Sequence, residues 1–531
     1  MKHLLVELND LPDEILMIIL EKLLKVEVLY SLIGVNKRLS RIVHDPIFTN
    51  CLLLMTYSSD GFIDPLSDPM LDRFCSKILP AIHYQIKWLN LESSSMERIL
   101  RATNYPNLCG LGLFNMNVET ALSLFKEESF LGSTFKKQIT SLDIDGIADE
   151  KIISIRHTLV FTQIFSLFNN LKYLNFNSSA CCYSFEISFF KSVPNVFSST
   201  LLELHVTLKV FNDCLYLLDG RFNQLHTLHV DVSVIHRSDL TMSNKGKISN
   251  LKFFSLHCNM STNDYDELIV PLLQRMSNLE KLDLYLIVCG KQTFIDGNEL
   301  KKNIINHMSR LNKFSFNIRS IIRLYNQINL ASNQDIQHTF EDFQDNQIIS
   351  CVDYFSQAEK GQCLIYSYPY RLKYYDRITN NFSGDLFECV REITLFDEQP
   401  FEHEFFLRIS HSFPFMQSLT LFNTKPQQKI LRSRSKQNNQ DIPIIKYPHL
   451  VKLNLTEAHI DYIEQFLVHW KTSLTNIVRL SVGYRSLRVV TRDFRRNTTR
   501  INCTKLIPIC IYAGNDWPQY VKNYFPCLRI F

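Results

Sequence analysis

The sequence predicts a mixed α/β protein in which a short helical segment precedes a long series of alternating strands and helices. The first observation is a short motif, apolar-x-x-apolar-x-apolar, that recurs thirteen times between residues 86 and 482. The second is an apolar run over residues 15–24, in which eight of ten side chains are apolar and which Pro12 shortly precedes. Strand-like and helix-like segments that alternate along a chain are typical of an α/β fold.

Residues 8–45 are expected to form three helices. Pro12 suits the first turn of a helix, and Asp10 is a candidate cap for its free N–H groups. A second helix fits residues 26–33, and a third carries apolar side chains on one face and basic ones on the other. A first helix that is apolar almost all round must be covered on more than one side, and about fifty residues are too few to enclose it. Part of this surface is therefore expected to remain for a partner.

The order of residues in this segment resembles the F-box. The resemblance rests on Leu8, Leu11, Pro12, Glu14, Ile15, Leu16, Ile19, Leu20, Leu23, Leu24, residues 35–39, Ile42, Asp45, Pro46 and Phe48. It departs from the family at Leu39 and Phe48, where the family often has tryptophan. The resemblance implies a three-helix module that docks on the small adaptor subunit of a cullin-type ubiquitin ligase. The implied adaptor-binding residues are Leu11, Pro12, Ile15, Leu16, Ile19, Leu20, Leu23, Val35 and Leu39. The alternative is a helical cap that seals the core of the next domain.

The recurring motif predicts a series of short strands that share one core. Its central residues lie 22 to 34 positions apart, except for one step of 79 between residues 314 and 393. The motif occupies residues 86–91, 108–113, 139–144, 171–176, 201–206, 225–230, 251–256, 279–284, 311–316, 390–395, 416–421, 450–455 and 477–482. The residue between its last two apolar positions is never a large apolar one, as expected for the outward side of a strand. The pattern resembles the leucine-rich repeat family, which implies an irregular solenoid of strand–helix units.

These observations divide the chain into six segments. Residues 1–52 are an F-box-like helical module, 53–85 a linker or N-terminal cap, 86–316 leucine-rich repeats, 317–389 a degenerate repeat or an insertion, 390–482 further repeats, and 483–531 a C-terminal cap. Residues 363–368 (CLIYSY) are a candidate for the degenerate repeat, and residues 505–513 could supply an end strand. The polar, basic stretch 424–441 is expected to be a loop.

Composition narrows the classes of partner. A net charge of +4 on 57 basic and 53 acidic residues gives little reason to expect a nucleic acid or an anionic membrane. The fourteen cysteines show no C-x-x-C pair, which favours reduced thiols in the cytoplasm or nucleus. The first residues turn acidic too early for a secretory signal, and the apolar runs are too short to span a membrane. The sequence therefore predicts a soluble intracellular protein.

The outward face of the predicted strands, which is the concave face in leucine-rich repeats, is the candidate surface for binding a target protein. The residues that we assign to it are Trp88, Asn90, Asp143, Tyr173, Asn175, His205, His229, Phe253, Lys281 and Asp283. Aromatic side chains at the centre of a surface are typical interface anchors, and the outward row becomes mostly basic from about residue 281. A target with an apolar anchor and an acidic or phosphorylated segment would suit this layout. The alternative is that loops or the C-terminal tail cover these residues.

No constellation in the sequence predicts chemistry. Motifs of the forms G-x-S-x-G, G-x-x-x-x-G-K-S/T and G-x-G-x-x-G do not occur, and His226-x-x-His229 lacks further ligands for a metal. We therefore expect no catalytic residue, no metal and no cofactor. The resemblances imply the substrate-recognition subunit of an SCF-type cullin-RING ubiquitin ligase, with the F-box on the adaptor and the repeats on an unknown target protein. The alternative is a leucine-rich-repeat scaffold that has no role in ubiquitin transfer.

Overall fold

The computed structural model describes residues 11–57, 63–146, 154–177, 186–189, 196–237, 248, 250–324, 330–343, 347–428, 443–511 and 519–529. Leu8, the expected cap Asp10 and most of the expected loop 424–441 lie outside these residues. The fold is mixed α/β and contains a large, mostly parallel sheet. The chain divides into two compact units. Unit 1 comprises Met1–Cys289 and Glu299–Phe316, and unit 2 comprises Gly290–Asn298 and Asn317–Phe531.

Unit 1 begins with four short helices and continues as alternating strands and helices. Its helices are α1 (Asp13–Leu20), α2 (Lys25–Leu32), α3 (Lys37–Val43), α4 (Pro46–Thr49), α5 (Asp68–Arg73), α6 (Leu79–Ile82), α7 (Met96–Leu100), α8 (Val118–Leu124), α9 (Phe130–Phe135), α10 (Ser154–Leu167), α11 (Phe211–Leu217) and α12 (Val270–Gln274), with the π-helical turns η2 (Phe74–Ile78) and η3 (Tyr265–Ile269) and the 3-10 turn η4 (Ile305–His307). Helix α13 (Gly297–Asn303) runs from unit 2 into unit 1.

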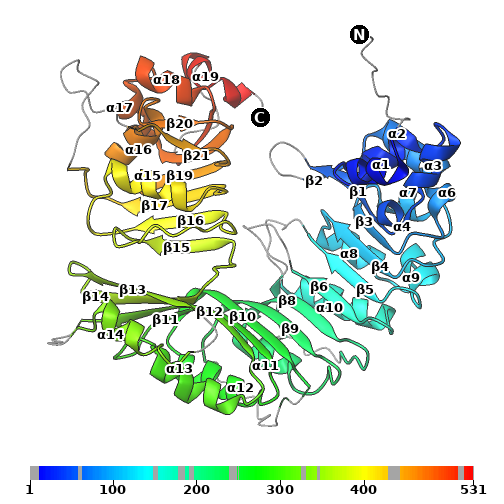
Figure 1. Cartoon of the computed structure of the whole chain (residues 1–531), viewed down its shortest axis with the longest axis horizontal. Helices are drawn as coiled ribbons and strands as arrows, with labels where there is room; N and C mark the ends of the chain where they lie inside the picture. Colours follow the sequence, from blue (N-terminus) through cyan, green and yellow to red (C-terminus); the bar gives the residue numbers. More distant parts are fainter. Residues whose placement is uncertain are drawn as a thin grey trace. The chain divides into compact units, whose positions relative to one another are not determined.

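The strands of unit 1 follow one another side by side in almost sequential order. They are β1 (Cys51–Tyr57), β2 (Ile63–Pro65), β3 (Trp88–Glu92), β4 (Gly110–Phe114), β5 (Ser141–Ile144), β6 (Tyr173–Phe176), β7 (Glu186–Ile187), β8 (Glu203–Val210), β9 (Thr227–Val234), β10 (Phe253–Thr262), β11 (Lys281–Val288) and the start of β12 (Lys313–Arg323). The order β1-β3-β4-β5-β6-β8-β9-β10-β11 is parallel throughout, and β2 pairs antiparallel with β1. Helices α9, α11 and α12 lie along one side of these strands (Figure 1).

Unit 2 combines an antiparallel segment with a second parallel sheet. Its strands are the rest of β12, β13 (Ile348–Phe355), β14 (Lys360–Ser367), β15 (Tyr374–Ile378), β16 (Glu392–Phe396), β17 (Ser418–Asn423), β18 (Ile445–Tyr447), β19 (Lys452–Ala458), β20 (Thr472–Leu474), β21 (Val478–Gly483) and β22 (Leu506–Ile511). Its helices are α14 (Asn333–His338), α15 (His403–Ser412), α16 (Ile460–Leu467), α17 (Tyr484–Thr491), α18 (Asn497–Cys503) and α19 (Gln519–Tyr524), with a 3-10 turn, η5 (Pro526–Arg529). The parallel order is β15-β16-β17-β19-β21-β22.

Each of the thirteen motif units contains a strand, so the predicted strands are confirmed. Buried and half-buried residues alternate along these strands, as the motif predicts. In β9, for example, Leu228, Val230 and Val232 are buried while the residues between them are half-buried. Side chains of a strand point alternately to its two faces, so one apolar face enters the core. The end strand expected in residues 505–513 is also present, as β22, which pairs with β21.

Two segments differ from the sequence prediction. Within the stretch 363–368, residues 363–367 belong to β14, an antiparallel strand between β12 and β13, so this stretch is not a parallel repeat strand. A parallel strand does occur nearby, β15, which pairs with β16. In addition, the predicted linker or cap 53–85 contains most of β1, together with β2, α5, η2 and α6. Because β1 pairs directly with β3, the sheet begins before the first motif unit.

Candidate functional site

The outward face of the unit 1 sheet carries all ten residues that the sequence assigned to target binding. They lie on strands β3, β5, β6, β8, β9, β10 and β11, at positions between buried apolar residues. Lys281 is exposed, and the other nine are half-buried. Their common face follows from the pleat, because residues two apart on a strand point the same way and the parallel register aligns neighbouring strands.

Trp88 and Asn90 form the first cluster on this face. The Trp88 indole N–H donates a hydrogen bond to Asn90 Oδ1 at 2.8 Å. On the neighbouring strand the paired residues are Gly110 and Gly112. A Cβ atom at Gly110 would lie 1.9 Å from Trp88 Cε3, and one at Gly112 would lie 2.1 Å from Asn90 Oδ1. Two glycines on β4 therefore make the space that these two side chains occupy.

Asp143 and Asn175 form the next contact, between β5 and β6. The Asn175 amide donates to Asp143 Oδ1 at 2.9 Å. Burial raises the pKa of Asp143, although the hydrogen bond from Asn175 opposes that shift. The carboxylate is therefore held in a partly dehydrated position on the face of the sheet.

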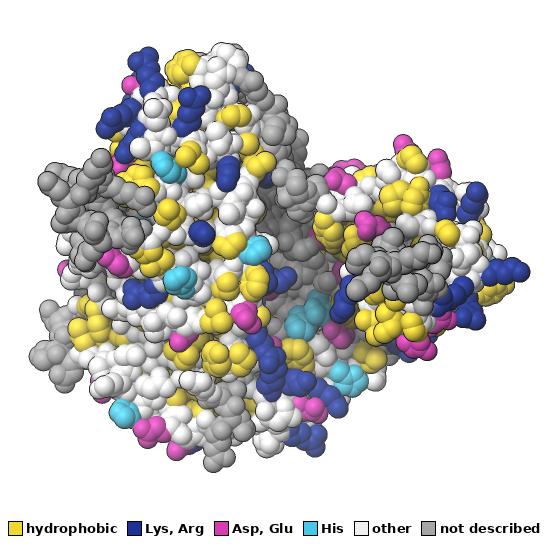
Figure 2. All heavy atoms as spheres, turned by 45° about the horizontal axis from the view of Figure 1, so that its top comes forward, with side chains coloured by type: hydrophobic (Ala, Val, Ile, Leu, Met, Phe, Trp, Pro, Cys, Tyr) yellow, Lys and Arg dark blue, Asp and Glu magenta, His cyan; other side chains and the backbone are white. Residues whose placement is uncertain are grey.

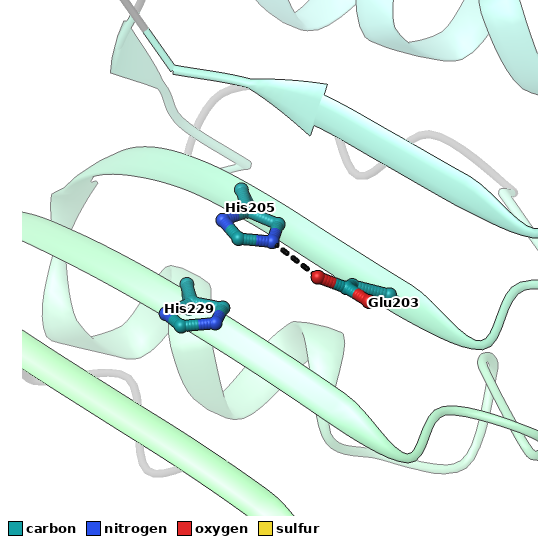
Figure 3. A group of neighbouring side chains, drawn as sticks. All are labelled: Glu203, His205 and His229. Carbon is teal, nitrogen blue, oxygen red and sulfur yellow. Dashed lines mark hydrogen bonds and ion pairs between the residues drawn. The ribbon is translucent and has the colours of Figure 1, made fainter. Parts of the chain in front are cut away.

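Glu203, His205 and His229 lie together on β8 and β9 (Figure 3). His205 Nε2 is 2.7 Å from Glu203 Oε1, and the two imidazole rings stack with their centroids 4.0 Å apart and their planes at 15°. Among the described residues this is the group of three or more side chains that could hold a metal ion, with one potential ligand atom from each within 4.8 Å of the others. Burial, with a further contribution from His205, lowers the pKa of His229 to about 4. His229 is therefore neutral at pH 7.

Aromatic rings flank this cluster on both sides. The Tyr173 ring lies 5.6 Å from His205 between centroids, and the Phe253 ring meets His229 edge-on at 4.6 Å. Burial and the nearby carboxylates of Asp143 and Glu203 raise the pKa of Tyr173 to about 12. Four rings thus form a row across β6, β8, β9 and β10.

A second polar cluster, which the sequence did not indicate, lies further along the same strands. Asp231 is 2.8 Å from His257 Nδ1 and accepts a hydrogen bond from Asn177 at 2.6 Å, and Thr207 donates to Asn177 at 2.6 Å. Burial alone would raise the pKa of Asp231, but the hydrogen bond and charge of His257 outweigh it and the pKa is lowered. The only signal in the sequence was the position of Asp231 and His257 directly after the motif, two residues beyond its outward position.

The N-terminal helices present an apolar surface. Their exposed apolar side chains are Ile15 (43%), Ile18 (56%), Ile19 (41%), Leu23 (51%), Leu24 (64%), Val35 (60%) and Ile47 (40%). Figure 2 shows several hydrophobic side chains exposed on this part of unit 1. Ile15, Ile18 and Ile19 share one face of α1, because residues three and four apart on a helix are neighbours. The prediction that part of this surface is left uncovered within the chain is therefore confirmed for the described residues.

The same helices correct part of the predicted adaptor-binding set. Pro12, Ile15, Ile19, Leu23 and Val35 are exposed and Leu11 is half-buried, but three other members are buried. Leu16 is 0% exposed, and Leu20 and Leu39 are each 4% exposed. Leu16 and Leu20 are four residues apart on the inner face of α1, so they belong to the core of the helical segment. Ile18, Leu24 and Ile47 are exposed apolar residues that the sequence pattern did not nominate.

An ion-pair cluster fixes α1 against α3. Asp13 lies 2.7 Å from Arg38 Nε and 2.6 Å from Arg41 Nη2. Arg38 also donates to the backbone carbonyl of Leu11. The hydrogen bond from Arg38 holds the pKa of Asp13 below its usual range, with a further contribution from Arg41. The contact orients the exposed face of α1 relative to α3.

Among the described residues, every helix falls short of the length and apolar character needed to cross a membrane. A comparison of the chain with protein-family models finds no match, and a comparison with curated proteins finds none either.

Proposed function

We propose that this chain is the substrate-recognition subunit of a cullin-type ubiquitin ligase, with an F-box-like module at residues 1–52 and an irregular leucine-rich-repeat array after it. The observation that carries the proposal is the exposed apolar face of Ile15, Ile18 and Ile19 on α1. Burying a side chain of this size contributes about 1.5–3 kcal/mol. Three of them left in water on one short helix are well explained by a partner that covers them.

The order of helices supports the same proposal. Three helices, α1, α2 and α3, follow one another between Asp13 and Val43, as the resemblance to the F-box implies. The loop after α1 adds Leu23 and Leu24, and the loop between α2 and α3 adds Val35. An apolar surface with few charges at its centre is typical of protein–protein interfaces. The adaptor subunit is the occupant that the family resemblance implies for it.

The sheet face is the proposed surface for the target protein. It combines aromatic groups (Trp88, Tyr173 and Phe253) with fixed polar groups such as Asn90 and Asn175. Aromatic anchors surrounded by hydrogen-bonding groups are the usual composition of a binding hot spot. Parallel strands about 4.8 Å apart make such a face long enough for a protein rather than a small molecule.

The proposed mechanism requires no chemistry from the chain itself. Holding the target near a ubiquitin donor that is recruited separately would raise the effective concentration of target lysines. The catalytic groups would then belong to other subunits. This division of roles agrees with a sequence in which no catalytic motif was found.

Co-purification of the full chain with the adaptor subunit tests the proposal. We expect the wild-type chain to retain the adaptor and Ile18→Asp to lose it, because a carboxylate at an apolar contact cannot be desolvated cheaply. The matched control is Ile155→Asp, which changes another exposed isoleucine of unit 1 (47% exposed) on α10. Circular dichroism of each variant checks that the fold is retained. Failure of the wild-type chain to bind the adaptor would overturn the ligase proposal.

The second candidate is a protein-interaction scaffold whose helices only cap the sheet. One observation favours it: α4 ends at Thr49 and β1 begins at Cys51, so the helices lead directly into the sheet. Arg73 of α5 also donates to the carbonyl of Ile33 at 3.1 Å, which ties α2 to the layer beneath. A scaffold of this kind predicts that Ile18→Asp and Ile155→Asp behave alike in every binding assay.

A further inference from the structure

We propose that Glu203, His205 and His229 bind one Zn²⁺ ion on the outward face of the unit 1 sheet. The proposal does not depend on the ligase function. Glu203 and His205 come from β8, and His229 comes from β9. One carboxylate oxygen and one nitrogen of each imidazole already lie within 4.8 Å of one another.

The backbone fixes the positions from which these side chains start. Glu203 and His205 are two residues apart on one strand and therefore point to the same face. His205 and His229 are direct register partners in the parallel pair β8–β9, so their Cα atoms sit about 4.8 Å apart. Sites built on strands are held more firmly than sites on loops.

The three potential ligand atoms, which lie within 4.8 Å of one another, must move closer together to form a site. In tetrahedral coordination with Zn–N and Zn–O bonds near 2.0–2.1 Å, ligand atoms lie about 3.3 Å apart. The Glu203–His205 pair is already at 2.7 Å. The two imidazoles stack with nearly parallel planes (Figure 3), so their in-plane nitrogen lone pairs do not yet converge, and one or both rings would turn about their side-chain bonds to bind a common ion. The ion would replace the Glu203–His205 hydrogen bond.

The donor set favours zinc over the alkaline-earth ions. Two imidazoles and one carboxylate suit Zn²⁺, whereas Mg²⁺ and Ca²⁺ prefer sites made only of oxygen ligands. Asp231 follows His229 by two residues on the same face, and Asp143 lies within electrostatic reach of His205. Their negative charge favours a cation here. With three protein ligands, the fourth position is left for water or for a donor group of a bound partner.

The neighbouring His257 is a histidine on this face whose two ring nitrogens are both already in contact with polar groups. Its Nδ1 is 2.8 Å from Asp231 and its Nε2 is 2.9 Å from Asn259, so both ring nitrogens have a partner. His229, by contrast, makes ring contacts with His205 and Phe253. Within the described residues, neither of its nitrogens has a hydrogen-bond partner. A half-buried imidazole with free lone-pair capacity beside a second imidazole and a carboxylate is chemically ready for a metal.

Zinc binding to the untagged full chain tests the proposal. After treatment with a chelator and its removal, the wild-type chain is mixed with Zn²⁺ alone, and bound metal is counted after gel filtration. We expect one tightly held Zn²⁺ per chain and its loss in His205→Asn and in His229→Asn. The controls are His226→Asn, directly before β9, and His257→Asn, on β10. Both change nearby histidines and should leave the Zn²⁺ stoichiometry unchanged.

Two further measurements keep the result clear if a histidine variant fails to fold. Glu203→Gln alters a side chain that is 39% exposed, so it should fold while weakening Zn²⁺ binding by at least about tenfold. Substituting Co²⁺ should give the intense visible absorption of a tetrahedral ion. A wild-type chain that holds no stoichiometric Zn²⁺, or a His205→Asn/His229→Asn double variant that still holds it, would overturn the site. Neither result would affect adaptor binding, so failure here and failure of the ligase proposal are distinguishable.

Discussion

The indole of Trp88 lies over Gly110, its register partner on the adjacent strand. A Cβ atom at Gly110 would come within 1.9 Å of the indole Cε3, far inside van der Waals contact. The glycine is therefore required by the tryptophan rather than by any turn in the backbone. The Trp88 ring on β3 can lie across the neighbouring strand only because β4 has a glycine, without a side chain, at the paired position.

We expect Gly110→Ala to displace the Trp88 ring and break its 2.8 Å hydrogen bond to Asn90. A more exposed indole emits at longer wavelength. The Trp88 contribution is isolated by subtracting the emission spectrum of Trp88→Phe from that of the wild type, and by the same subtraction in the Gly110→Ala background. Identical difference spectra in the two backgrounds would contradict the packing.

Truncating a side chain to alanine should affect the stability of the fold strongly on one face of α1 and weakly on the other. Leu16 is 0% exposed, so Leu16→Ala should lower the free energy of unfolding by about 2–5 kcal/mol. Ile18 is 56% exposed, so Ile18→Ala should change it by only about 0.5 kcal/mol or less. Urea unfolding of both variants provides the measurement. If the two substitutions lower the free energy of unfolding equally, the assignment of the inner and outer faces of α1 is wrong.

Asp213 should make stability depend on pH. It is buried in the first turn of α11 and accepts hydrogen bonds from the N–H groups of Phe189 at 2.8 Å and Val210 at 3.2 Å. Burial raises its pKa to about 6, above the ordinary value of 3.8. The folded state therefore binds this proton more tightly than the unfolded state does, so the contribution to stability grows as pH falls from 7 towards 4.

The matched variant for this effect is Asp213→Asn, which cannot titrate. Between pH 7 and pH 5 the wild type should gain about 1 kcal/mol of unfolding free energy relative to the variant. Measuring both proteins at both pH values cancels the titration of other groups. A wild-type-to-variant difference that does not change with pH would show that the Asp213 pKa is ordinary.

In unit 2, two glycines should respond differently to alanine. A Cβ atom at Gly297 would lie 2.2 Å from the backbone oxygen of Thr339, which cannot move aside easily. Gly297→Ala should therefore lower the free energy of unfolding by about 1–3 kcal/mol. The control is Gly483→Ala, where the nearest atom to a new Cβ is Ser486 Oγ at 3.7 Å, an ordinary contact. Thermal denaturation of the two variants separates the predictions, and equal midpoints would contradict the close approach at Gly297.

The strands were predictable because their signal is local. Each motif unit sets an apolar residue at alternate positions, as at Leu228 and Val230, and burial of one face follows from that spacing alone. The direction of pairing is not local. Residues 363–368 satisfy the apolar pattern of a repeat strand, yet β14 runs antiparallel to β12, because a tight connection from β13 returns the chain in the opposite direction.

The histidine pair shows the same limit at the level of a site. The sequence drew attention to His226 and His229, which stand three positions apart and so cannot point to the same face of a strand. The partner of His229 is instead His205, at the same position of the preceding motif unit, and only the register of β8 with β9 brings them together. Their common position in consecutive units was the available signal. The same holds for Ile18 and Leu16. Only their exposed fractions in the structure tell the outer residue from the inner one, because the sequence of a helix that is apolar nearly all round does not show which side faces inward.

The direct passage from α4 into β1 has a consequence for geometry. A single residue, Asn50, separates the two elements, and its carbonyl accepts hydrogen bonds from the N–H groups of Lys87 and Trp88, each at 2.9 Å. The stacked rings of Tyr30 and Phe74 add a second attachment between α2 and the turn η2. The helices and the first strands are therefore joined by direct contacts instead of by a long linker. If the proposed partners bind to the helices and to the sheet face, these contacts set the distance between the two binding surfaces, and the target lysines within reach would be selected by their position.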